Sequence, residues 1–153
     1  MDTSNSGGVA AKLGFLYQDC AAALYVTEML LDKAIEAVRC EVTDDIDIIY
    51  SDYIEYVQVK TTDKLRWTVV SVTERTRGAD KKYIAESSMV HKSMKCDAPG
   101  QKKSKFRMVS PNVTKSPLDY LEIDVSRRKG KPGKDELIHE LENKLTNFQA
   151  LLA

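Results

Sequence analysis

The run Glu41-Val-Thr-Asp-Asp-Ile-Asp-Ile-Ile-Tyr-Ser-Asp-Tyr-Ile-Glu-Tyr-Val-Gln-Val-Lys60 decides the fold of this chain. Its β-branched and aromatic residues predict two short strands, Ile46–Tyr50 and Ile54–Lys60, joined by a tight turn at Ser51-Asp52. Because a strand sends alternate residues to opposite faces, one face of this hairpin is apolar and the other polar. We expect the apolar face to pack inward, which leaves the polar face for chemistry.

The polar face carries two pairs of side chains, each spaced two residues apart. Asp45 and Asp47 share it on the first strand, as do Gln58 and Lys60 on the second. A turn at Ser51-Asp52 places Asp45 opposite Gln58, whereas a turn one residue later places Asp47 opposite Gln58. Directly opposed side chains have Cβ atoms roughly 5 Å apart. Both registers gather the same groups, and the better turn chemistry of Ser-Asp favours Asp45 as the central residue.

This combination of carboxylates, a carboxamide and an ammonium suits the metal-dependent hydrolysis of a phosphodiester. Hard divalent cations prefer oxygen ligands, a bound metal polarises the phosphate and activates water, and a lysine stabilises the developing charge. Gln58 offers a neutral oxygen where a glutamate would offer a charged one, which predicts weaker metal binding. The alternative is an exposed hairpin with an ordinary polar face.

Length and composition exclude several other classes of protein. The chain has 153 residues, which is enough for one domain with a sizeable core, and it has no net charge. Its apolar stretches are far shorter than a membrane span, and its polar N-terminus does not resemble a signal peptide. Cys20, Cys40 and Cys96 match no zinc or disulfide pattern, which predicts reduced thiols in a cytoplasmic protein. With only His91 and His139, a histidine metal site or a Ser-His-Asp triad is disfavoured.

The rest of the chain predicts an α/β fold, a sandwich with a central mixed sheet flanked by helices. After a flexible leader (residues 1–13), we expect a long, well-buried helix from Gly14 to about Arg39 and a core that extends to residue 125. Residues 126–134 are a basic linker, and residues 135–153 an amphipathic helix that packs on its own domain or against a partner. The other expected elements are a strand near Val38–Val42, a strand or helix start at Trp67–Val72, a helix at Lys81–Lys95, a loop at Cys96–Lys105, a strand at Phe106–Ser110 and an ambiguous segment at Leu118–Val125.

Three short motifs together resemble the PD-(D/E)xK nuclease superfamily in its Gln-x-Lys variant. Gly14-Phe-Leu-Tyr17-Gln18 is similar to the opening of Mrr-like restriction endonuclease domains. Glu41…Asp44-Asp45-Ile46, followed by Val57-Gln58-Val59-Lys60, is similar to the nuclease domain of bacterial anti-phage dsDNA endonucleases. Those endonucleases are fused to CD-NTase nucleotide sensors or paired with a HerA-like ATPase. The resemblance covers roughly residues 14–125 and implies a restriction-endonuclease-like sandwich.

The resemblance also implies roles for individual residues. Asp45 or Asp47 would be the principal metal ligand, Gln58 the second ligand position and Lys60 the catalytic lysine. Gln18 would reach the site from the helix. Glu41 would lie at its edge as a further ligand, and the metal would be Mg²⁺ or Mn²⁺.

Charge is unevenly distributed, with acidic side chains predominant up to Gln58 and basic ones from Val59 to Lys134. Basic side chains bind DNA through phosphates, which position a duplex without reading its sequence. The candidate DNA contacts are Lys64, Arg66, Lys102, Lys103, Lys105 and Arg107. We therefore expect a double-stranded DNA endonuclease of low sequence specificity in anti-phage defence, gated by homo-oligomerisation, with an ATPase or nucleotide-sensing partner and no membrane partner. The alternative is a catalytically weak DNA-binding or assembly module on the same fold.

Overall fold

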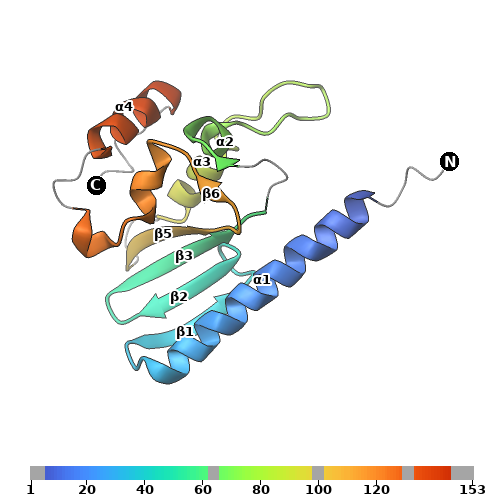
Figure 1. Cartoon of the computed structure of the whole chain (residues 1–153). Coiled ribbons are helices and arrows are strands. Elements are labelled where there is room, and N and C mark those ends of the chain that lie inside the picture. Colours follow the sequence, from blue (N-terminus) through green and yellow to red (C-terminus); the bar gives the residue numbers. More distant parts are fainter. Residues whose placement is uncertain (1–5, 62–65, 98–101, 129–132, 146–153) are drawn as a thin grey trace. The chain divides into compact units, whose positions relative to one another are not determined.

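The computed structural model of the chain describes residues 6–61, 66–97, 102–128 and 133–145, which fall into two compact units (Figure 1). Unit 1 comprises the chain up to Thr61 together with Cys96–Pro111, and unit 2 comprises Thr62–Lys95 and the chain from Asn112 onward. The expectation of a mixed α/β fold is confirmed, because the chain combines helices with a four-stranded mixed sheet. Among the described residues, no helix is both long enough and apolar enough to cross a membrane.

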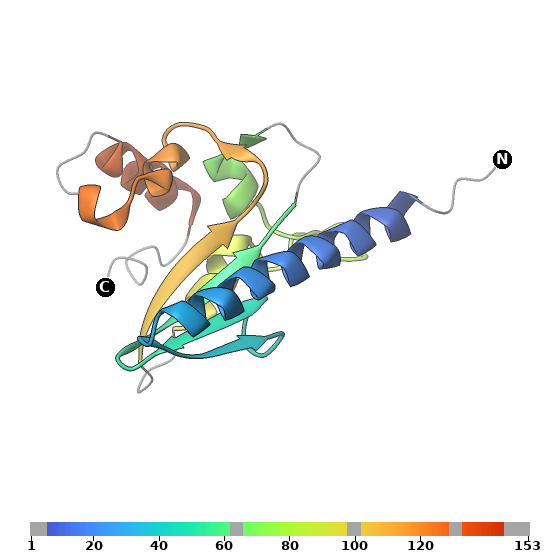
Figure 2. The same ribbon diagram turned by 60° about the horizontal axis from the view of Figure 1, so that its bottom comes forward.

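Unit 1 is a sheet with one long helix, α1 (Ser6–Leu31), across one face (Figure 2). The strand order is β1 (Ile35–Cys40), β2 (Ile46–Tyr50), β3 (Tyr53–Val59) and β5 (Lys103–Val109). The first three strands are antiparallel, and β5 is parallel to β3. The sheet is therefore mixed, as predicted.

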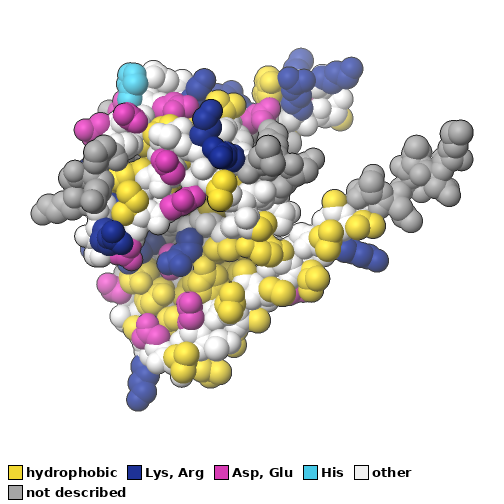
Figure 3. Space-filling model, viewed as in Figure 1, with side chains coloured by type: hydrophobic (Ala, Val, Ile, Leu, Met, Phe, Trp, Pro, Cys, Tyr) yellow, Lys and Arg dark blue, Asp and Glu magenta, His cyan; other side chains and the backbone are white. Residues whose placement is uncertain are grey.

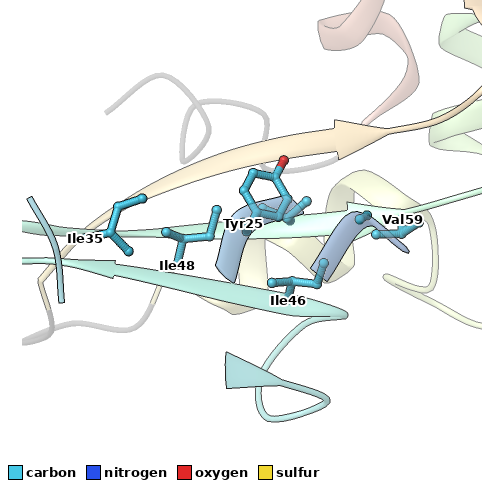
Figure 4. Close-up of a cluster of buried hydrophobic side chains, with 7 residues drawn as sticks. Tyr25, Ile35, Ile46, Ile48 and Val59 are labelled. Carbon is cyan, nitrogen blue, oxygen red and sulfur yellow. The ribbon is translucent and has the colours of Figure 1, made fainter. Parts of the chain in front are cut away.

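The register of the β2–β3 hairpin matches a turn at Ser51-Asp52. Ile46 pairs with Val57 and Ile49 pairs with Ile54, so the alternative turn one residue later is excluded. The apolar face packs inward as predicted, and the structure shows that it packs against α1 (Figure 4). The buried members of this core are Ala21, Tyr25, Ile35, Ile46, Ile48, Val57 and Val59.

Helix α1 begins at Ser6 and ends at Leu31, whereas a helix from Gly14 to about Arg39 was predicted. The segment predicted to be a flexible leader includes Ala10 and Ala11, which are strong helix formers and continue the helix toward the N-terminus. At the other end, Asp32 Oδ1 accepts the backbone N–H of Ala34 at 2.9 Å and turns the chain into β1.

Helix α1 was predicted to be well buried, but only the side that faces the sheet is buried. Ala21 and Tyr25 are buried on the side that faces the sheet, whereas Leu13, Leu16 and Leu24 are exposed. The sequence is apolar around much of the helix, and a single sheet covers only one side of it.

Strands β1 and β5 are displaced from their predicted positions. β1 ends at Cys40, not Val42, because Glu41 adopts a left-handed backbone conformation (φ 57°) and donates its N–H to the carbonyl of Asp45 at 3.1 Å. β5 begins at Lys103, inside the segment predicted to be a loop. Its first residues alternate in direction like the rest of the strand and pair with Tyr53 and Ile54.

Unit 2 consists of short elements. A two-stranded parallel pair, β4 (Arg66–Trp67) and β6 (Val113–Thr114), accompanies helices α2 (Val69–Thr73) and α3 (Met89–Lys95). The segment Trp67–Val72 thus contains both a strand end and a helix start. The ambiguous segment forms two 3₁₀ helices, η1 (Leu118–Glu122) and η2 (Val125–Arg127).

Two helices of unit 2 differ in length from the prediction. The helix predicted at Lys81–Lys95 is reduced to α3, because Lys81 and Glu86 adopt left-handed backbone conformations that interrupt it. The C-terminal helix α4 spans Lys134–Lys144 and packs against α2 and η1, burying Leu137 and Leu145. It therefore packs within unit 2, and residues 146–153 of the predicted helix lie outside the described part of the chain.

Candidate functional site

Asp45 and Lys60 meet at the end of the hairpin where β3 terminates. Lys60 Nζ lies 3.0 Å from Asp45 Oδ2, and the same oxygen accepts the backbone N–H of Val59 at 2.8 Å. The backbone N–H of Lys60 donates to the carbonyl of Val109 on β5 at 2.9 Å. Strand β3 is thus fixed from both sides at this point, and the Lys60 side chain keeps 36% of its surface exposed. A cation is held at the surface against a carboxylate, within reach of an anionic substrate.

The carboxylate side of this pair comes from the loop over residues 41–45. Its conformation is set by internal hydrogen bonds, since Asp44 Oδ1 accepts the N–H of Asp45 at 3.0 Å and Asp47 Oδ1 accepts that of Asp44 at 3.1 Å. Gln18 reaches this loop from α1 and donates its amide N–H to Glu41 Oε1. The structure therefore brings Gln18 and Glu41 together, as well as Asp45 and Lys60.

Asp47 and Gln58 are both buried on the sheet face opposite α1. Asp47 is paired across the hairpin with Tyr56, and its carboxylate supports the 41–45 loop. Gln58 is 6% exposed, and its Oε1 atom has no hydrogen-bond partner among the described residues. Of the two aspartates between which the sequence left a choice, Asp45 is therefore the one in contact with Lys60.

Asp44 is a site residue that the sequence argument did not select. Its Oδ2 atom is buried and, like Gln58 Oε1, finds no partner among the described residues. Burial raises the pKa of the Asp44 carboxyl, although hydrogen bonds from the Asp45 backbone and the Gln58 side chain lower it. The three neighbouring carboxylates Asp44, Asp45 and Asp47 were the signal, since like charges so close together need a cation or burial to be tolerated.

The donor set is compatible with a hard divalent cation. Gln58 Oε1 and Asp44 Oδ2 are buried oxygens that lack a partner among the described residues, and such cations prefer oxygen ligands. In the described part of the chain, no three His, Cys, Asp or Glu side chains are grouped as a metal site. A bound ion would therefore need the Gln58 amide oxygen, the carboxylates of Asp44 and Asp45, and oxygens of water or substrate.

Two of the predicted DNA contacts are engaged inside unit 1. Lys102 Nζ donates to the carbonyl of Tyr50 at 2.6 Å and to Glu36 Oε2 at 3.2 Å. Arg107 Nε donates to Glu55 Oε1 at 2.7 Å, and Glu55 is buried. These contacts give both residues a structural part in the sheet.

The other candidate DNA contacts lie in three different places. Along β5, every second residue points to the same face, so Lys103 and Lys105 share the face of Arg107. This is the sheet face that α1 packs against, not the face of Gln58. Both are exposed, and Lys105 Nζ lies 3.4 Å from the centroid of the Tyr53 ring. Arg66 is exposed in unit 2, and Lys64 lies outside the described residues. The predicted DNA-binding role of these residues stays a prediction.

Comparison with known proteins gives one family and one curated relative. Residues 6–152 match the family described as Cap4, dsDNA endonuclease domain. The chain is 49% identical over 148 residues to Anti-bacteriophage protein A of Escherichia coli (strain K12), and this alignment covers 97% of the chain but 28% of the relative. No solved structure matches. Because the match spans nearly all of the sequence and includes the Asp45–Lys60 hairpin, the chain belongs to the Cap4 dsDNA endonuclease domain family.

Proposed function

We propose that this chain is a metal-dependent endonuclease domain that cuts double-stranded DNA with low sequence specificity, as an effector of anti-phage defence. Membership of the Cap4 dsDNA endonuclease domain family supports the reaction and the substrate. The name of the relative, Anti-bacteriophage protein A, supports the biological setting. The observation that carries the proposal is the Asp45–Lys60 pair beside the buried amide of Gln58.

Each residue of the hairpin has a distinct part in this proposal. Asp45 orients the ammonium of Lys60, which stabilises the negative charge that develops on the scissile phosphate. Asp44, Asp45 and Gln58 would hold Mg²⁺ or Mn²⁺ through oxygen atoms, with Asp47 and Glu41 supporting the loop that carries them. When bound, such an ion would polarise the phosphate and lower the pKa of a water molecule.

Assembly is a further part of the proposal. The chain spans 28% of the length of Anti-bacteriophage protein A, so an ATPase or nucleotide-sensing partner, in the same polypeptide or a separate one, is compatible with its size. Homo-oligomerisation would place two such sites on opposite strands of a duplex and would restrain cutting by isolated chains.

A second candidate function is a catalytically weak DNA-binding or assembly module. The observation that favours it is the neutral amide of Gln58 in a site where the described residues offer no cluster of three acidic or other metal-binding side chains. Fewer charged ligands mean weaker retention of a divalent ion.

Replacing Lys60 by Ala tests the proposal. We expect plasmid DNA to be degraded by the wild-type protein with Mg²⁺ or Mn²⁺ and not with EDTA. The Lys60→Ala variant should lose cleavage but stay folded and retain binding in a gel-shift assay, because its loss leaves only the partly exposed carboxylate of Asp45 without an ion pair. The matched control is Lys33→Ala, which removes an exposed lysine from the turn after α1.

Three results would each contradict a different part of the proposal. Cleavage by Lys60→Ala at the wild-type rate would remove Lys60 from the reaction. Cleavage in EDTA would remove the metal. Binding of duplex DNA without cleavage under either metal would favour the binding module.

A further inference from the structure

The side of α1 that faces away from the sheet is an exposed apolar stripe. Hydrophobic side chains follow the helix along much of its length (Figure 3). We define the outer stripe as the exposed residues Val9, Leu13, Leu16, Cys20, Ala23, Thr27 and Leu30. Leu16 is 58% exposed and Leu30 is 77% exposed, so these side chains are not part of the core of unit 1.

The spacing of the outer stripe is that of a coiled coil. Successive members are separated by four, three, four, three, four and three residues, which is the heptad repeat of two helices that wind around each other. No member of the stripe is charged. The buried residues Ala21 and Tyr25 lie on the other side of the helix, so the stripe is separate from the contact with the sheet.

We propose that the outer stripe is a dimer interface, in which α1 packs against α1 of a second copy of this chain. A heptad stripe fits another long helix with the same repeat, and a second copy supplies one through a symmetric contact. Among the described helices, α2, α3 and α4 span at most the 11 residues of α4, and α4 already buries Leu137 and Leu145 within unit 2. A second copy of α1 has the same length and the same heptad spacing, so it matches the stripe along its whole length.

The size and charge of the stripe fit this occupant. Leu24 and Leu31 flank it and are 67% and 83% exposed, which widens the apolar surface. A helix of 26 residues is about 39 Å long and about 10 Å across, so one side of it covers on the order of 400 Å² per copy, the scale of a weak, concentration-dependent dimer. The described part of α1 has one basic residue, Lys12, and so lacks the basic flank of a helix that lies on an anionic membrane.

The interface would also act on the candidate site. Gln18 lies on the same helix and holds Glu41 from the side opposite the outer stripe. Pairing of two copies would order α1 and with it the 41–45 loop. The inference does not depend on nuclease activity, since it concerns the mass of the particle and not the reaction.

Light scattering coupled to size exclusion tests the interface. We expect the wild-type chain to have twice its 17.2 kDa mass at high concentration, and Leu16→Glu to have the monomer mass. The matched control is Phe15→Glu, which places the same charge on a neighbouring exposed residue (62% exposed) that lies off the stripe, and it should remain a dimer. Circular dichroism should show equal helix content in all three proteins.

Cys20 provides a second measurement, because it is exposed and lies near the middle of the outer stripe. In a Cys40→Ala background, a short bismaleimide should join two copies through Cys20, and Leu16→Glu should abolish the cross-link. A wild-type monomer at every concentration, or equal loss of dimer in Phe15→Glu, would overturn the proposal. Flotation of a monomeric chain with anionic vesicles would assign the stripe to a membrane instead. A normal dimer without DNA cleavage would leave the interface standing and reject only the nuclease.

Discussion

Asp45 Oδ2 accepts two hydrogen bonds at once, from Lys60 Nζ at 3.0 Å and from the backbone N–H of Val59 at 2.8 Å. One oxygen atom thus joins the loop after β1 to the end of β3 and sets the direction of the lysine. The bond from the Val59 N–H stabilises the fold, and the bond from Lys60 Nζ positions the ammonium for the proposed reaction. The two contributions are separable by mutation, because an asparagine oxygen still accepts the backbone bond but carries no negative charge to hold the ammonium.

Asp45→Asn should therefore abolish DNA cleavage with little loss of stability. The amide oxygen can still accept the Val59 N–H, and the partly exposed ion pair with Lys60 contributes about 1 kcal/mol. Asp45→Ala removes both bonds and should lower the free energy of unfolding by about 1–3 kcal/mol. Urea denaturation of both variants, beside a plasmid assay, measures the difference. Equal destabilisation by the two substitutions would contradict the separate roles.

The features that could be predicted from the sequence are those set by contacts between residues close together in the chain. The hairpin register and its apolar face follow from alternation and turn chemistry within 20 residues of chain, and both are confirmed. The same alternation places Asp45 and Lys60 on one face, whereas the ion pair between them is a finding of the structure. The start of α1 was wrong because the leader was judged by its polar residues and not by Ala10 and Ala11. The roles of individual residues in catalysis remain predictions.

Interactions over longer distances in the sequence could not be anticipated. Arg107 was grouped with DNA-binding residues by its basic neighbours, whereas its partner Glu55 lies 52 residues earlier and is buried. Nothing in the local pattern around either residue indicates that β5 runs beside β3. The buried Oδ2 oxygen of Asp44 is of the same kind, because its burial depends on how the 41–45 loop folds back on Gln58.

Gln58→Glu should strengthen metal binding and weaken the fold without metal. A carboxylate in place of the Gln58 amide adds negative charge to the oxygen donors that would hold the metal. When no cation is present, this carboxylate and that of Asp44 repel each other. We expect a lower melting temperature in EDTA than for the wild type and a larger upward shift when Mg²⁺ is added. Differential scanning fluorimetry across a Mg²⁺ titration measures both. A melting temperature that does not respond to Mg²⁺ in either protein would place the metal elsewhere.

Arg107→Ala should destabilise the chain, although the residue was predicted to contact DNA. Its removal leaves the buried carboxylate of Glu55 without its 2.7 Å ion pair, which costs about 1–3 kcal/mol of unfolding free energy at this partly exposed site. The double variant Glu55→Gln/Arg107→Ala removes both charges and should recover part of that loss. Lys105→Ala is the matched control, since its contact with the Tyr53 ring contributes only about 0.5–1 kcal/mol. Urea denaturation decides, and equal stability of Arg107→Ala and the wild type would contradict this reading.

Cys96 should resist thiol reagents that modify Cys40 rapidly. Cys40 is exposed, whereas Cys96 is buried, and burial followed by the charges of Asp44 and Asp47 raises the pKa of the Cys96 thiol to about 11. The thiolate is the reactive form, so at pH 8 an ordinary thiol with a pKa of about 8.5 offers roughly a hundredfold more of it. In a Cys20→Ala background, we expect one fast and one slow reaction with Ellman's reagent, the slow one becoming fast in denaturant. Two equally fast reactions in the native protein would show that Cys96 is not held beside the acidic loop.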